Sequence, residues 1–159
     1  MSDLVEATDL ISKIFFDRWK ADTPSIIGYV PEVIWESAQM DLYNGAAGPP
    51  GPPPAPPTPN KAFARFIIRH VNGQQRSLSE PGGRRFNHYG VVIVQTLTPM
   101  SAGRNSLVAQ RLAQVALSAF QGRAIRDVWF RNVRYTEIGR DGLFYQINVM
   151  ADFERTEIA

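Results

Sequence analysis

The chain has 159 residues and a mass of 17.8 kDa, a size that predicts a single domain. It contains no cysteine, which excludes disulfides, cysteine nucleophiles and cysteine-ligated metal sites. No apolar run reaches the roughly 18 residues of a membrane-spanning helix, and the acidic start of residues 1–6 is unlike a signal peptide. We therefore expect a soluble protein that is made in the cytoplasm.

The charge is distributed unevenly along the chain. Residues 1–60 carry three basic and eight acidic side chains, whereas residues 61–159 carry fourteen basic and seven acidic ones. Arginine supplies 14 of the 17 basic residues, and its planar guanidinium group suits interfaces better than lysine does. A nucleic-acid surface and a self-assembling protein with faces of opposite sign both fit this distribution, and so does an arginine content that only reflects the encoding genome.

The first third of the chain predicts a helix and a short strand. Residues 4–20 have the spacing of an amphipathic helix, with five apolar residues on one face: Leu10, Ile11, Ile14, Phe15 and Trp19. We expect the helix to end before Thr23-Pro24, because the residue that precedes proline is disfavoured in the α region. The apolar segment Ile26–Val30 then predicts a strand that ends at Pro31.

Residues 46–59 form a proline-rich insertion, in which residues 48–59 hold eight of the twelve prolines. Such a run cannot enter a helix or a central strand, so it predicts an extended spacer between two strands. A docking site for an SH3-like or WW-like partner is the alternative interpretation.

Strands dominate the middle of the chain. Residues 62–71 are aromatic and β-branched, and Asn72-Gly73 predicts a turn directly after them. The loop Ser77–Gly83 leads into a strand over residues 84–97, and its apolar centre Val91–Val94 predicts a strand covered on both faces. Thr98-Pro99 is expected to end it.

The last third predicts a second helix and a hairpin. Residues 104–121 have helical spacing, and Gln121-Gly122 is a typical helix end. Two strands, over residues 126–138 and 142–154, flank the hairpin signal Arg140-Asp141-Gly142. Together these elements predict an α+β fold: a mixed, mainly antiparallel sheet with two helices packed on one face.

Residues that could carry catalysis or bind a metal are few. His70 and His88 fall in predicted strands and lack the spacing of metal ligands. A triad of Ser101, His88 and Asp127 can be drawn, but no nucleophile motif supports it. We therefore expect a protein that is not an enzyme, with no cofactor and no metal site.

Two segments have features of nucleic-acid or phosphate binding. Pro81–Arg85 places two glycines beside two arginines, a combination that could bind phosphate. Phe63 and Phe66 lie among Arg65 and Arg69 and could stack bases, as in RNA-recognition modules. Their spacing of three, however, places the two rings on opposite faces of a regular strand.

A larger pattern combines several of these segments. It begins with Phe15-Phe16-x-x-Trp19 before Thr23-Pro24 and continues with Gly90–Val94, Thr98-Pro99 and Gly103. It closes with a helix that ends in Ala119-Phe120 and a hairpin that carries Phe144–Val149 and Phe153. In this pattern, over most of residues 8–154 outside the proline-rich insertion, the chain resembles the tail terminator (tail completion) proteins of long-tailed bacteriophages.

The resemblance implies a structural virion protein that forms a six-membered ring. Such a ring caps the tail tube, stops its polymerisation and forms the joint to the head-side connector. The implied partners are other copies of the chain, the tail tube protein and a head-tail connector or head completion protein. DNA would pass only transiently through the lumen, and no membrane is involved. The implied location is the neck of the virion, after synthesis in the cytoplasm of the host bacterium.

Two alternatives remain open: another neck or minor tail protein, and a monomeric nucleic-acid-binding module. If the protein recognises an unfinished protein ring, flexible loops that carry arginine are the best candidates for the contact, because loops adapt to a partner. The candidate interface residues are Arg76, Arg84, Arg85, Arg104, Arg140 and Asp141.

Overall fold

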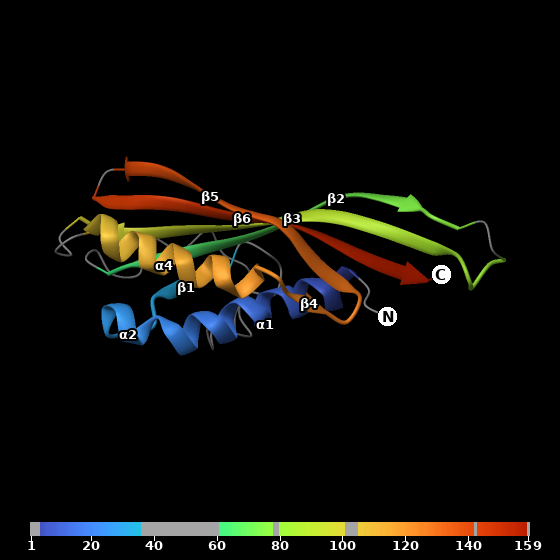
Figure 1. The fold of residues 1–159 in the computed structure, drawn as a ribbon, viewed down its shortest axis with the longest axis horizontal. Coiled ribbons are helices and arrows are strands. Elements are labelled where there is room, and N and C mark those ends of the chain that lie inside the picture. The colour runs from blue at the N-terminus through green and yellow to red at the C-terminus, as the bar shows by residue number, and fades with distance from the viewer. Residues whose placement is uncertain (1–3, 36–60, 78–79, 101–104, 142, 159) are drawn as a thin grey trace, which may run out of the picture.

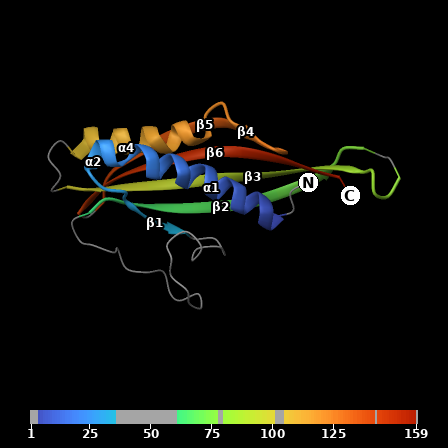
Figure 2. The same ribbon diagram turned by 90° about the horizontal axis from the view of Figure 1, so that it is seen from below.

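The computed structural model describes residues 4–35, 61–77, 80–100, 105–141 and 143–158. Its six strands form one sheet in the order β1-β2-β3-β6-β5-β4, and two long helices cover one face of that sheet (Figures 1 and 2). Strands β1 and β2 are parallel, and all other neighbours are antiparallel. The fold is therefore α+β with a mixed, mainly antiparallel sheet, as the sequence predicts. The proline-rich insertion lies outside the described residues.

The two long helices are those that the hydrophobic spacing predicts. Helix α1 (Leu4–Asp22) ends just before Thr23-Pro24 and buries one residue per turn completely: Ala7, Ile11, Phe15 and Trp19. Helix α4 (Asn105–Phe120) packs on the sheet through Leu112, which is 1% exposed, and through its neighbours on the same face. Gly122, with φ +66°, lets the chain leave that helix in a left-handed conformation.

An aromatic cluster fills the space between the helices and the sheet. The ring of Phe15 lies 5.0 Å from Phe66, 5.4 Å from Trp19 and 6.2 Å from Phe120. Each aromatic pair contributes about 0.5–1.5 kcal/mol beyond the area that it buries. The indole nitrogen of Trp19 donates a 2.9 Å hydrogen bond to the carbonyl of Pro31, so this buried polar group is satisfied.

The strand predicted at Ile26–Val30 is wrong. Residues Pro24–Ile27 form a short helix, α2, because proline is favoured in the first helical turn. Gly28 (φ +84°) ends α2 and donates a backbone hydrogen bond to the carbonyl of Pro24. Strand β1 (Glu32–Trp35) starts after Pro31 rather than ending at it.

The turn predicted at Asn72-Gly73 is also wrong. Strand β2 (Phe63–Gln75) runs through this dipeptide and pairs with β3 (Arg85–Pro99) as far as Gln75, with a bulge between His70 and Asn72. Gly73 serves close packing instead, since a Cβ there would lie 2.6 Å from the imidazole of His88. The hairpin turns at residues 76–84, where a loop is predicted, and β3 ends at Pro99 as expected.

The predicted cover on both faces of Val91–Val94 is contradicted as well. Val92 and Val94 are fully buried beneath the helices, whereas Val91 and Ile93 point to the opposite face and are only half-buried. We call this opposite side of the sheet the open face, because no described helix covers it (Figure 1). Phe66 points to the helices and Phe63 to the open face, as their spacing predicts.

The last hairpin lies where the sequence predicts it. Strand β5 (Val128–Asp141) and strand β6 (Phe144–Ile158) pair up to Asp141 and Phe144, and each extends further than expected. Two irregularities interrupt β5, one at Asn132 (φ +53°) and one before Gly139 (φ +91°). Strand β4 (Ala124–Ile125) pairs with only the first two residues of β5, so no other described strand pairs with the outer edge of β5 beyond them.

Candidate functional site

The predicted interface residues lie at two opposite ends of the molecule. Arg76, Arg84 and Arg85 belong to the β2–β3 hairpin, which projects beyond the helices at one end (Figures 1 and 2). Arg140 and Asp141 close β5 at the other end, beside the β5–β6 turn. Arg104 lies outside the described residues. The structure therefore does not bring the predicted residues together into one site.

The hairpin end is ordered by its own hydrogen bonds. The backbone nitrogen of Arg76 donates to the carbonyl of Arg85 at 2.7 Å, and the Ser77 hydroxyl accepts from the nitrogen of Arg85 at 2.8 Å. The Arg76 guanidinium donates to the hydroxyl of Tyr89 at 2.8 Å, and this hydrogen bond raises the pKa of Arg76. The side chain of Arg85 remains exposed, so it can meet a partner without breaking the hairpin.

Each of the two histidines makes a polar contact within the fold. Nε2 of His70 lies 3.1 Å from the hydroxyl of Thr8 on α1, and Nε2 of His88 lies 2.9 Å from a carboxylate oxygen of Glu157. Partial burial, followed by the charges of Arg155 and His88, lowers the pKa of His70 below 6.5. These contacts tie the helix and the strands together. Among the described residues, no group of three or more metal-ligating side chains occurs.

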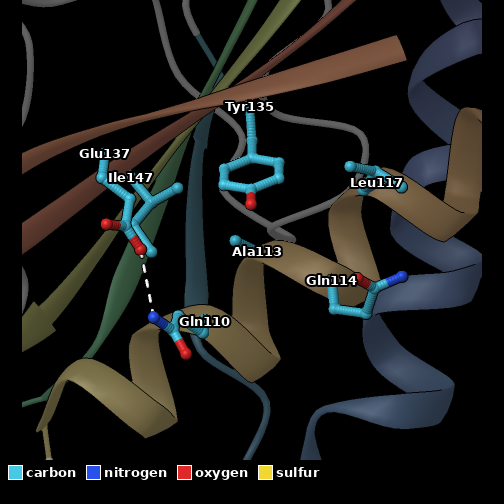
Figure 3. Close-up of a pocket in the computed structure, with 7 residues that line it drawn as sticks. All are labelled: Gln110, Ala113, Gln114, Leu117, Tyr135, Glu137 and Ile147. Carbon is cyan, nitrogen blue, oxygen red and sulfur yellow. Dashed lines mark hydrogen bonds between the residues drawn. The ribbon is translucent and has the colours of Figure 1, made fainter.

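A groove of about 260 Å³ runs between α4 and β5 (Figure 3). Ala113, Leu117 and Ile147 give it an apolar floor, and the ring of Tyr135 stands over it with its hydroxyl toward α4. At its rim, the side-chain amide of Gln110 donates to Glu137 at 3.1 Å. The groove brings together no nucleophile and base. It offers a recess for an apolar side chain rather than a reaction centre.

Large apolar side chains are exposed along β5 and next to its end, a feature that the sequence analysis missed. We define the β5 rim as Leu107, Tyr135, Ile138 and Leu143, which are 39%, 61%, 52% and 70% exposed. The start of α4 and the β5–β6 turn lie at the same end of the molecule in both views (Figures 1 and 2). Clustered apolar exposure of this kind typically marks a surface that another protein covers.

The open face carries a polar network that the sequence analysis also missed. Glu154, which is 7% exposed, accepts a hydrogen bond from Asn87 at 2.6 Å and forms an ion pair with Arg131 at 3.2 Å. The guanidinium of Arg131 also lies 5.7 Å from the ring centre of Tyr89. The alternation of side chains along a strand could have shown which side of its own strand Arg131 or Glu154 occupies. Their meeting depends on the strand order.

Comparisons with known proteins concern the fold of the chain. No family model matches the chain, and no curated protein is significantly similar to it in sequence. One solved structure, whose name states no function, superposes with a TM-score of 0.56 at 14% identity, over 93% of this chain and 94% of that chain. The likeness concerns the fold alone. None of the described helices is both long and apolar enough to cross a membrane.

Proposed function

We propose that the protein is a structural virion protein of a long-tailed bacteriophage, a tail terminator that assembles into a six-membered ring. In this proposal it caps the tail tube, stops the tube's polymerisation and joins it to the head-side connector. The protein acts by recognising other proteins and catalyses no reaction. The supporting observation is the exposed apolar surface of the β5 rim, beside a strand edge that no described strand covers beyond its first residues.

The physical argument concerns how a ring closes. A head-to-tail ring needs two different, complementary patches on each subunit. The β5 rim offers the apolar patch, and the groove between α4 and β5 offers a recess beside it. The projecting β2–β3 hairpin, with Arg84 and Arg85, offers a second surface at the other end, suited to a tube or connector protein. In this proposal, neighbouring subunits of the ring meet at the end that carries the β5 rim. The tube or connector protein is bound at the end that carries the β2–β3 hairpin.

The ring can be tested by measuring mass. In light scattering, with and without tail tubes, we expect the wild type to form a species of about six times 17.8 kDa. The double substitution Ile138→Asp and Leu143→Asp should yield monomers, because buried carboxylates would oppose the contact. Val5→Asp, at another exposed apolar residue (56% exposed), is the matched control and should keep the ring. A monomeric wild type under both conditions would contradict the ring.

Tail length tests termination itself. Charge reversal at Arg84 and Arg85 should leave the domain folded, since Arg85 is exposed, Arg84 is half-buried in the hairpin turn, and charges at the surface contribute little to stability. In an assembly assay it should give tails of irregular or excessive length, because tube growth is not arrested. Normal lengths with this variant would reject these two arginines as the docking site. Normal lengths in the complete absence of the protein would reject the terminator assignment.

A further inference from the structure

The two faces of the molecule differ in charge. Among the described side chains, the open face carries three carboxylates and six arginines: Arg65, Arg69, Arg76, Arg85, Arg131 and Arg134. Helices α1 and α4 together carry four acidic and four basic residues, so the opposite side of the molecule is balanced. The excess of positive charge is therefore concentrated on the open face.

Within this face, only Arg131 and Arg134 are in ion pairs that the described residues form, and the two arginines of β2, like Arg85 on β3, are in none. Asp152 holds Arg134 at 3.3 Å, and Glu154 holds Arg131 at 3.2 Å. In contrast, no described carboxylate pairs with Arg65 or Arg69. Arg69 is exposed, and Arg65 is half-buried with its guanidinium 6.0 Å from the ring centre of Phe63. These two cations keep their full charge for an external anion.

The row of cations continues along the strand to Arg76. A β-strand rises about 3.3 Å per residue, so Arg65 and Arg76 are separated by roughly 35 Å, which is about one turn of duplex DNA. Between them lies a shallow basin of about 460 Å³, lined by Tyr89, Val91, Arg131 and Asp152 among others, and the carboxylate of Asp152 is held by Arg134. The basin gives the row a concave surface rather than a ridge.

We infer that the open face binds the phosphate backbone of duplex DNA without sequence preference, through Arg65, Arg69 and Arg76. The aromatic side chains argue against single strands, because Phe63 is buried and the ring of Tyr89 is covered by Arg131. Unpaired bases therefore find no stacking platform along β2, and the exposed Trp129 of the same face lies on β5, separated from β2 by β3 and β6. A duplex needs no such platform, because its charged backbone faces outward. This inference does not rest on the proposed ring, since the row lies within one subunit.

The test is fluorescence anisotropy with a 30-base-pair duplex of random sequence, from 50 to 200 mM salt. The wild type should bind, and Arg65→Gln combined with Arg69→Gln should weaken binding about tenfold or more at 50 mM salt. The slope of the logarithm of the binding constant against the logarithm of the salt concentration should be smaller by about 1.8 in that variant, because each phosphate contact contributes about 0.9 to this slope. The matched control Lys13→Gln with Arg111→Gln removes two exposed charges from the helices and should bind like the wild type.

Each contrary outcome would overturn the inference. These outcomes are absence of wild-type binding at 50 mM salt, equal weakening in the control, tighter binding of a 30-nucleotide single strand, and equal binding of polyglutamate. The last would indicate an acidic protein as the partner. Light scattering of the same samples keeps the two proposals apart, because a ring without DNA binding contradicts only this inference and DNA binding by monomers contradicts only the ring.

Discussion

Truncating Leu112 to alanine should destabilise the domain by about 3 kcal/mol. The side chain is 1% exposed and points from α4 onto strands β3, β5 and β6. The change removes three buried carbons at about 0.8 kcal/mol each, roughly 2.4 kcal/mol in total. A residual cavity of roughly 25 Å³ would add about 0.6 kcal/mol at 24 cal/mol per Å³, and the sum lies within the usual range of 2–5 kcal/mol.

Urea unfolding followed by circular dichroism measures this loss directly. In thermal unfolding followed by the same signal, we expect the melting temperature of a domain of this size to fall by roughly 6–12 °C, since each kcal/mol corresponds to about 2–4 °C. Gln114→Ala, on the exposed side of the same helix, is the control and should change stability by less than about 0.5 kcal/mol. If Leu112→Ala kept full stability but prevented oligomerisation, the apolar face of α4 would be an interface and the packing argument would fail.

Three further predictions concern pH, the proline-rich insertion and a glycine. The lowered pKa of His70 means that the folded state binds a proton less tightly than the unfolded one, so stability should fall as the pH drops below about 6.5. In urea titrations at pH 7.5 and 5.5, His70→Gln should reduce the difference in unfolding free energy between the two pH values, and an unchanged difference would contradict the prediction. Replacing Ala47–Pro57 by a short Gly/Ser linker should leave the melting temperature nearly unchanged, because these residues cannot extend a strand ladder; loss of cooperative unfolding would refute the spacer interpretation. Gly90→Ala should cost about 1–3 kcal/mol in the same denaturation assay, since its Cβ would lie 2.3 Å from the ring of Phe153 and 2.5 Å from the carbonyl oxygen of Arg69; a neutral result would show that both the ring and the neighbouring strand can move.

The sequence predicted those parts of the fold that depend on local spacing. The apolar positions of α1 and α4 recur every three or four residues, and burial confirms them at Phe15 and Leu112. Of two errors, one came from a local signal that strand pairing overrides, and the other from a local helix signal that was given too little weight. Asn72-Gly73 is extended because β3 continues to pair with it, and Ile26 is helical because Pro24 starts a turn.

The candidate sites were less predictable, because they depend on which strands become neighbours. Nothing local in the sequence indicates that β5 lies at the side of the sheet, so the exposure of Tyr135 and Ile138 could not be expected. Similarly, Arg131 on β5 and Tyr89 on β3 come within reach of each other because a single strand, β6, separates their strands in the sheet. Arginine content drew attention to the β2–β3 hairpin, and its role as an interface stays a prediction. It could not distinguish Arg69, which no described carboxylate pairs, from Arg131, which Glu154 holds.

The two irregularities of β5 have a consequence for the aggregation of newly made chains. A long, straight strand edge is a template for amyloid-like aggregation of newly made chains. In β5 the breaks at Asn132 and Gly139 leave only a short regular stretch between them, too short to seed a stable intermolecular ladder. Another molecule that attaches along this side must therefore do so mainly through its side chains, because the backbone of β5 offers no long regular ladder.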